Sequence, residues 1–183
     1  FDRSIDVVIA THPDADHIAG LSGVFERYKV GGYVSSGVEN DTSQTHALVD
    51  AVEKEKGIQE VEARRGMRLD IGGGAYIDIL FPDRDVSQVE TNTGSIVARL
   101  VYGQTSFLLT GDSPLSVEDY LVSLDGNALE STVLKAGHHG SRTSTGETYL
   151  EAVDPEYVVV SAGKDNGYGH PHTEVIERIK ESG

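Results

Sequence analysis

Two imidazoles and two carboxylates lie within a stretch of six residues near the start of the chain, around Pro13. Imidazole nitrogens and carboxylate oxygens bind divalent cations, and carboxylates this close together repel one another when no cation lies between them. Proline disfavours regular structure, so we expect a tight loop that directs several of these groups into one volume. The alternative is a polar loop in which one aspartate caps the next helix. The number of such groups favours a metal site with the candidate ligands His12, Asp14, Asp16 and His17.

Three later segments place the same residue types directly after apolar runs. Asp112 follows the run 107–110, and a second run ends before two adjacent histidines that are flanked by glycines. A third run leads into a loop in which His170 precedes Pro171, an arrangement that favours extended backbone. The alternative role of Asp112 is to cap the helix that follows it. These segments add four candidates for metal binding or proton transfer: Asp112, His138, His139 and His170.

Hydrophobic periodicity predicts a mixed α/β chain in which these polar groups follow strand ends. Strands are expected over residues 5–10, 33–36, 58–63, 67–71, 75–81, 95–102, 105–110, 131–136 and 157–161. Helices are expected over residues 21–28, 42–56, 114–124, 149–153 and 173–180. We expect neither His46 nor His172 to bind metal: His46 lies at the surface of one helix, and His172 is a solvent-facing partner in the first turn of another.

The composition is that of one soluble domain, over residues 1–183. A hydrophobic content of 38% suffices for a core, and no apolar run approaches the ~20 residues that cross a bilayer, so we expect no direct membrane insertion by this piece. The chain begins almost at a strand and stops just after a helix, which we interpret as a fragment cut at both ends. Because the chain has no cysteine, any metal must be bound by nitrogen and oxygen ligands.

The net charge of −15 argues against a large basic surface for nucleic acid. A small basic patch could form around Arg64, Arg65 and Arg68, but we favour the interpretation of this segment as a solvated turn between two strands. This charge disfavours a role as a DNA scaffold.

Four motifs in this order resemble the metallo-β-lactamase superfamily, and within it the soluble domain of the ComEC competence proteins, which take part in DNA uptake. The motifs are Thr11–Leu21, Leu108–Asp112, Leu134–Ser141 and Tyr168–Pro171. The resemblance implies an α/β (α+β) fold: an αββα metallo-β-lactamase sandwich, with two mixed sheets face to face, helices outside and a metal site along one edge. It also implies truncation, because family members carry strands before the histidine loop.

The chain departs from the usual superfamily pattern at two places. Asp14 stands where the second histidine of the first motif would be, as in the ComEC-like branch. No histidine occurs between His46 and His138, and Asn92 lies in roughly the region where the superfamily has one. The ligand shell of the first metal is therefore thin, and one ion is expected to be weakly bound or absent.

The resemblance implies one or two divalent metal ions, manganese or zinc. One ion would be held by His12, Asp14 and Asp112, and the other by Asp16, His17, Asp112 and His170. More oxygen and fewer nitrogen ligands shift the preference from zinc toward manganese.

The leading hypothesis is metal-dependent hydrolysis of a phosphodiester. The resemblance implies DNA as the substrate, and we expect it to be single-stranded. Asp16 would orient the attacking water or bind the second ion, and His138 or His139 would donate a proton or hydrogen bond. Lys135 and Ser141 are candidate phosphate contacts, and the alternative for Lys135 is a strand residue that faces solvent.

Two other hypotheses use the same residues. The first is a small-molecule ester, lactam or phosphoester hydrolase, which the acidic charge favours, and the second is a non-catalytic metal-binding interaction domain. ComEC-like parents are bacterial membrane proteins to which such a soluble domain is attached, whereas other relatives are free-standing.

Overall fold

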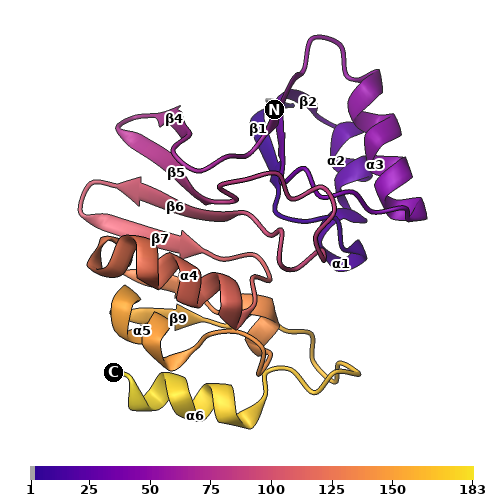
Figure 1. Cartoon of the computed structure of the whole chain (residues 1–183). Helices are drawn as coiled ribbons and strands as arrows, with labels where there is room; N and C mark the ends of the chain where they lie inside the picture. The colour runs from indigo at the N-terminus through magenta and orange to yellow at the C-terminus, as the bar shows by residue number, and fades with distance from the viewer. Residues whose placement is uncertain (1–2) are drawn as a thin grey trace.

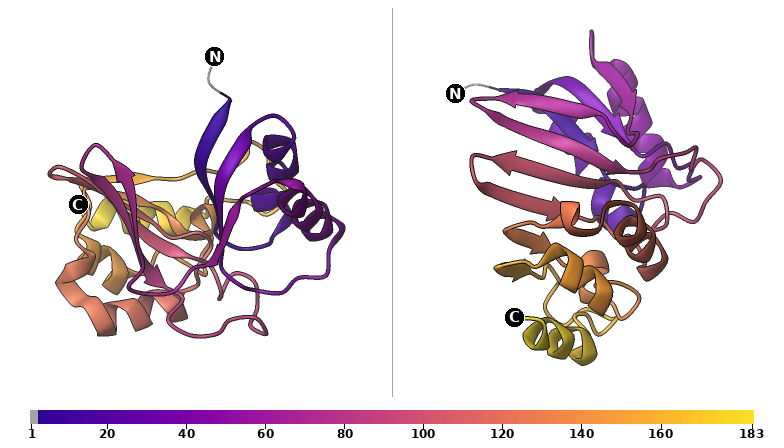
Figure 2. Two further views of the ribbon diagram at one scale, coloured as in Figure 1. Left: turned by 90° about the horizontal axis from the view of Figure 1, so that it is seen from above. Right: turned by 60° about the vertical axis from the view of Figure 1, so that its left-hand side comes forward.

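The computed structural model describes residues 3–183, which form two β-sheets with helices outside them (Figure 1). The views of Figure 2 show the layers: α1–α3 lie beside the smaller sheet and α4–α6 beside the larger one. This arrangement confirms the expected α/β sandwich. None of the helices in this part of the chain is long and apolar enough to span a membrane.

The smaller sheet is built from crossover units. Its three strands pair in the order β1-β2-β3 and all run parallel, where the resemblance led us to expect a mixed sheet. Parallel neighbours require crossover connections, which helices supply here. The elements are β1 (Ser4–Ala10), α1 (Ala15–Ile18), α2 (Leu21–Phe25), β2 (Lys29–Ser35), α3 (Ser43–Lys54) and β3 (Gln59–Glu62).

The larger sheet is mixed, with strand order β4-β5-β6-β7-β8-β9. Its first four strands are antiparallel, and β8 and β9 run parallel to β7. The strands are β4 (Arg68–Gly72), β5 (Ala75–Phe81), β6 (Val97–Tyr102), β7 (Thr105–Leu109), β8 (Val133–Lys135) and β9 (Tyr157–Val159). The helices are α4 (Leu115–Asp125), α5 (Glu147–Val153) and α6 (Thr173–Glu181), with short 3-10 turns η1 (Gly126–Leu129) and η2 (Gly137–Gly140).

Three apolar clusters correspond to the three interfaces of a four-layer sandwich. One cluster joins α1–α3 to the smaller sheet through residues such as Ile18, Leu48 and Val30. A second joins α4 and α5 to the larger sheet, and the third lies between the sheets and includes Val34 and Ile79. The sheets are therefore held face to face by a core of their own.

Strand β2 begins at Lys29, four residues before the expected start at residue 33. Two glycines hid this part of the strand, because glycine is depleted in strands. A Cβ at Gly31 would lie 2.9 Å from the carbonyl oxygen of Asp6 in β1, so the close approach of the two strands explains the glycine.

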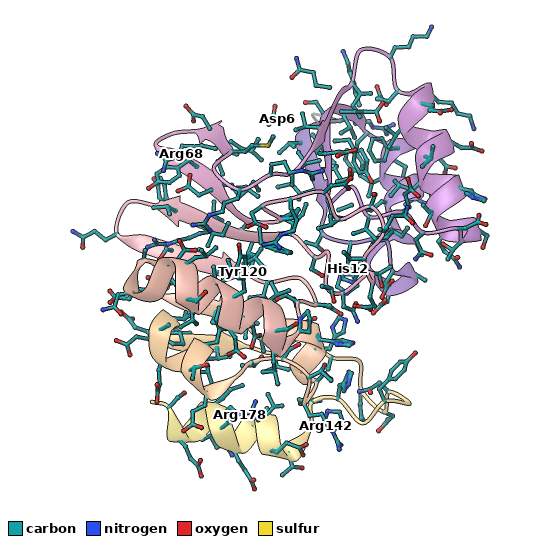
Figure 3. All side chains as sticks on the ribbon, viewed as in Figure 1. Asp6, His12, Arg68, Tyr120, Arg142 and Arg178 are labelled. Carbon is teal, nitrogen blue, oxygen red and sulfur yellow. The ribbon has the colours of Figure 1, made fainter. Side chains whose placement is uncertain are left out.

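The C-terminal ends of β1, β7, β8 and β9 carry the loops that contain the candidate residues. Because β7, β8 and β9 are parallel, their C-terminal ends meet at one edge of the larger sheet. His12, at the end of β1, lies where the smaller sheet meets these loops (Figure 3).

Candidate metal centre

The segment that leads from β1 into the first turn of α1 presents two carboxylates, Asp14 and Asp16. Asp14 occupies the N-cap position of α1 with extended backbone, yet within residues 3–183 its side chain makes no capping hydrogen bond. Its Oδ2 lies 3.8 Å from His12 Nε2, whereas the more exposed Asp16 has Oδ2 3.8 Å from His17 Nε2. Both carboxylates are therefore available to a ligand.

His12 is almost fully buried, and its Nε2 has no hydrogen-bond partner among the described residues. Burial, reinforced by the charge of His17, lowers the pKa of His12 to about 4. A neutral imidazole with a free ring nitrogen is the form that binds a metal ion.

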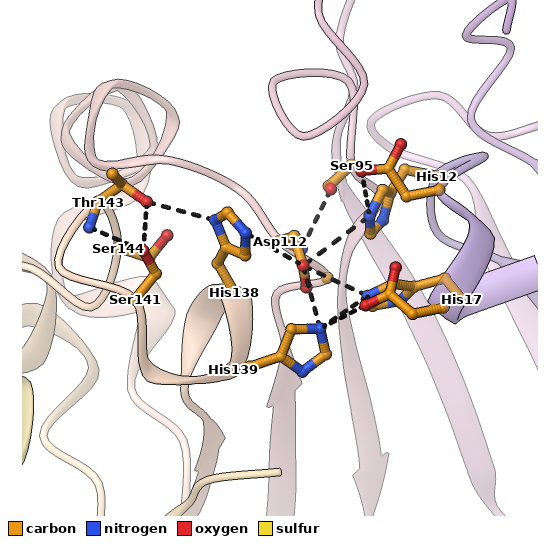
Figure 4. Close-up of polar contacts among 12 residues, drawn as sticks. His12, His17, Ser95, Asp112, His138, His139, Ser141, Thr143 and Ser144 are labelled. Atoms are coloured by element: carbon orange, nitrogen blue, oxygen red, sulfur yellow. Dashed lines mark hydrogen bonds and ion pairs between the residues drawn. The ribbon is translucent and has the colours of Figure 1, made fainter. Parts of the chain in front are cut away.

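Asp112 lies at the centre of the site, at the tip of β7 (Figure 4). Its Oδ2 is 3.3 Å from Nε2 of both His17 and His139 and 4.0 Å from Nε2 of His12. Burial raises the pKa of Asp112, but the hydrogen bond with His17 and the nearby positive charges lower it to about 2. The residue at the N-cap of α4 is Pro114, so the capping alternative for Asp112 does not apply.

Two consecutive histidines in η2, just after β8, have left-handed backbone, with φ of 45° at His138 and 56° at His139. Such φ values are unfavourable for residues other than glycine and persist at sites where the surrounding structure enforces them. His139 Nδ1 donates to the carbonyl oxygen of Ser161 at 2.8 Å, which leaves Nε2 without a proton in the neutral ring. This Nε2 lies 3.1 Å from His17 Nε2 and 3.2 Å from Asp16 Oδ2.

The structure thus groups the candidate ligands around His17, which two sets share. The first set is His12, His17 and Asp112, and the second is Asp16, His17 and His139. Within each set, the ligand atoms lie within 4.8 Å of one another. These sets differ from the ones that the resemblance implied. His139 enters the second set, whereas Asp14 and His170 lie outside both.

Asp14 and His170 instead line a pocket of about 430 Å³ over the cluster, together with Asp16, Asp112, His138, His139 and Tyr168. The His170 ring packs edge-on to His138 with centroids 5.5 Å apart. His138 Nε2 lies 3.9 Å from Asp112 Oδ2, so it also faces the pocket.

The two candidate phosphate contacts are engaged elsewhere. Lys135 Nζ donates to the carbonyl oxygens of Gly111 and Ala136 and lies 3.8 Å from Asp112 Oδ1. Ser141 is buried, with its hydroxyl 2.9 Å from that of Thr143. Lys135 therefore supports the turn that carries Asp112, and it does not face solvent as the alternative held.

His46 and His172, the two histidines that we did not expect to bind metal, differ in burial and in hydrogen bonding. His46 is exposed and pairs with Asp41 at 2.9 Å, as expected of a surface residue. His172 is half-buried, and its Nδ1 accepts the backbone N–H of Arg142. This hydrogen bond ties its ring to the loop after η2, and His172 belongs to neither candidate ligand set.

Sequence reasoning missed Ser95, whose Oγ accepts the backbone N–H of Asp112 at 3.1 Å. The β6–β7 hairpin contained a signal for it. Extending the register Ala98↔Leu109 by three residues in each strand places Ser95 opposite Asp112. Asn92, in contrast, has a buried side-chain oxygen without a hydrogen-bond partner among the described residues.

A model of the Metallo-beta-lactamase superfamily matches residues 2–164. The chain belongs to the metallo-beta-lactamase superfamily. Among its relatives, ComE operon protein 3 of Bacillus subtilis is 32% identical over 97% of this chain, and Competence protein ComA of Neisseria gonorrhoeae is 32% identical over 99%. The chain spans only 22% and 23% of the lengths of these two competence proteins.

Solved structures share the fold of this metallo-beta-lactamase domain. Igni18, a metallo hydrolase from Ignicoccus hospitalis, aligns over 97% of this chain and 72% of its own with a TM-score of 0.63 and 17% identity. CmlA, a diiron beta-hydroxylase from Streptomyces venezuelae, aligns over 100% of this chain and 43% of its own with a TM-score of 0.60 and 15% identity.

The cluster of this metallo-beta-lactamase domain fits a divalent metal ion. His12 Nε2 and Asp112 Oδ1 are buried polar atoms without hydrogen-bond partners among residues 3–183, and buried atoms of this kind usually have one. Each set provides two imidazole nitrogens and one carboxylate oxygen. This donor set is richer in nitrogen than the sequence led us to expect, which shifts the preference from manganese back toward zinc.

Proposed function

We propose that this metallo-beta-lactamase domain is a metal-dependent phosphodiesterase that cleaves DNA, with single-stranded DNA as its preferred form. The observation that carries the proposal is the cluster around Asp112, which opens into a pocket lined by further acid–base groups. The competence proteins among its relatives support DNA as the substrate, since DNA uptake defines competence.

The residues divide into those that hold a metal and those that act beside it. His12, His17, Asp112 and His139 would hold one or two ions of manganese or zinc, with Asp16 at the pocket side. A bound ion supplies a water of lowered pKa and neutralises charge on the phosphoryl oxygens.

Two residues of the pocket wall are placed for proton transfer. The Asp16 carboxylate is largely exposed and can accept a hydrogen bond from the attacking water. His138 faces the pocket through Nε2, while its Nδ1 lies 3.3 Å from the hydroxyl of Thr143. When the Thr143 hydroxyl donates to Nδ1, the proton of the neutral ring lies on Nε2, from which it can be donated to the leaving oxygen.

A second candidate function is hydrolysis of a small-molecule ester or phosphoester, and the surface charge favours it. The three arginines of the supposed basic patch each pair with a carboxylate: Arg64 with Glu62, Arg65 with Asp125 and Arg68 with Asp78. They leave little free positive charge for a DNA backbone. The third candidate, a non-catalytic metal-binding domain, predicts metal occupancy without turnover.

Cleavage of fluorescent single-stranded DNA and hydrolysis of p-nitrophenyl esters, each with added manganese or zinc, separate these candidates. We expect DNA cleavage that Asp112→Asn reduces at least 100-fold, because the variant removes the central anionic ligand. His46→Asn is the matched control, since His46 is an exposed histidine away from the cluster. Ester turnover without DNA cleavage, or stoichiometric metal without either activity, would overturn the DNA assignment.

A further inference from the structure

The Tyr168 side chain is unusually exposed for a large ring beside a candidate active site. It is 81% exposed, and its face stacks on His170 with ring centroids 5.7 Å apart and planes tilted by 23°. The His170 ring in turn contacts His138 in the wall of the pocket. The outer face of Tyr168 therefore extends a column of rings that starts near the metal cluster.

The loop that carries Tyr168 is ordered by one side chain. Asn166 Nδ2 donates to the carbonyl oxygens of Gly163 and His170, at 2.8 and 2.5 Å. Asn166 Oδ1 accepts the backbone N–H groups of Tyr168 and His170, at 3.1 and 3.0 Å. Four hydrogen bonds thus fix the backbone on both sides of the stacked pair. The backbone that carries the ring is thus fixed before any ligand arrives, and the ring itself stacks on His170, which reduces the entropic cost of binding.

Tyr168 lies between two depressions. It lines the pocket over the metal cluster and also a neighbouring pocket of about 270 Å³, bordered by Ser161, Ala162 and Gly163. Asp16 and His139 line both pockets. A chain-like substrate that passes through the first pocket can therefore place its next unit against the tyrosine face.

The charge of the domain makes a stacking contact important for binding DNA. The net charge of the domain is −15, and the arginines of the supposed basic patch are already paired, so this patch adds little affinity through phosphate contacts. Stacking of a base on an aromatic ring contributes about 1–3 kcal/mol, needs no positive charge and tolerates any base. Bases of a duplex are stacked on one another, so only a single strand offers a free face.

On the basis of the nuclease function proposed above, we propose that Tyr168, supported by His170, is a stacking platform for an unpaired nucleobase next to the scissile phosphate. The site takes single-stranded DNA without sequence preference and disfavours duplex DNA.

Substitutions at Tyr168 test the platform through binding. We expect Tyr168→Ala to weaken binding of a fluorescein-labelled single-stranded oligonucleotide roughly 5- to 150-fold, the equivalent of about 1–3 kcal/mol, and Tyr168→Phe to retain most of the affinity. An oligonucleotide of abasic sites should bind wild type and Tyr168→Ala equally. Tyr102→Ala is the matched control, because Tyr102 is 63% exposed at the far end of the β6–β7 hairpin.

The absence of tryptophan from the sequence offers a direct optical readout. Tyr168→Trp introduces a single indole whose fluorescence a stacked base quenches. We expect quenching by the oligonucleotide and none by its abasic counterpart, and no quenching in Tyr102→Trp with either. This signal reports contact with the base even if cleavage is slow.

The outcomes separate the two proposals. If wild type binds and cleaves single-stranded DNA while Tyr168→Ala behaves identically, the platform is overturned and the nuclease function stands. If wild type neither binds nor cleaves DNA, the nuclease function fails and the platform fails with it. Equal quenching of Tyr168→Trp by natural and abasic DNA also overturns the platform.

Discussion

At the scale of single residues, Gly111 determines where the Asp112 carboxylate lies. Its φ is +53°, a conformation that favours glycine, and a Cβ at this position would lie 2.9 Å from Ser95 Cβ and 3.2 Å from Thr11 Cβ. The residue therefore meets two constraints at once, a left-handed backbone and close contact with the segment before β6 and the segment after β1.

Comparison of two glycines separates these constraints. Gly111→Ala should lower the free energy of unfolding by about 2–4 kcal/mol, because strain and overpacking add. Gly103→Ala should lower it by only about 1–2 kcal/mol, since Gly103 has a φ of +60° but no described atom within 4 Å of its Cβ position. Urea denaturation measures both values. Equal losses would show that crowding against Ser95 and Thr11 contributes nothing.

The sequence identified the residue types of the site but not how they group. Histidines and aspartates at strand ends were recognisable from spacing, and all of those proposed as ligands lie in or around one pocket. The exchange of His170 for His139 beside His17 depends on two left-handed residues in η2. Positive φ at a histidine leaves no mark in hydrophobic periodicity, so spacing alone could not predict it.

At the scale of elements, a buried carboxylate joins α4 to the turn that precedes α5. Glu118 is fully buried and accepts the backbone N–H groups of Thr145 and Gly146 at 2.7 and 2.8 Å. Thr145 Oγ1 accepts in turn the N–H of Gly137, where the turn of His138 and His139 begins. Burial, only partly opposed by the two backbone hydrogen bonds, raises the pKa of Glu118 from 4.5 to about 7.

This raised pKa predicts a loss of stability as pH increases. Between about pH 4.5 and 7 the folded chain retains a proton that the unfolded chain has released, so rising pH favours the unfolded chain. The contribution is on the order of 3 kcal/mol over this window. Glu118→Gln cannot ionise and should remove it.

The quantity to measure is the difference in unfolding free energy between wild type and Glu118→Gln from pH 4.5 to 7.5, on protein freed of metal with a chelator. Taking the difference cancels the titration of histidines such as His12. A difference that stays constant across this range would contradict the assigned pKa of Glu118.

The boundaries of elements could be predicted where apolar periodicity was unbroken. Strand β5 has the expected bounds, and the predicted helix over 42–56 begins one residue later because Thr42 caps it through Oγ1. The predicted strand β2 was too short because Gly31 and Gly32 are selected by close contact with β1 and not by strand propensity. Such a contact between strands is invisible to local pattern.

At the scale of the whole molecule, the cluster of candidate ligands bridges the two sheets. His12, Asp16 and His17 follow β1 of the smaller sheet, whereas Asp112 and His139 follow β7 and β8 of the larger one. A bound ion would therefore stabilise the docking of the sheets as well as the local loops.

Manganese or zinc at 100 times its dissociation constant should raise the free energy of unfolding by about 2.7 kcal/mol. For a domain of this size, that corresponds to a rise in Tm of about 5–11 °C. Differential scanning calorimetry of metal-free and metal-loaded protein measures this rise in Tm. Asp112→Asn should lose it and His46→Asn should keep it, and an equal rise in both variants would place the bound ion elsewhere.

The positions of His17 and His139 also imply an order of events during folding. The two rings touch although 122 residues separate them in sequence. Contacts between residues so far apart in sequence generally form late in folding, because the loop between them must close before the contact stabilises the chain. We therefore expect the cluster to form once both sheets have assembled and docked. Metal affinity would therefore report that assembly is complete, because an unfolded chain has the ligands but not the site.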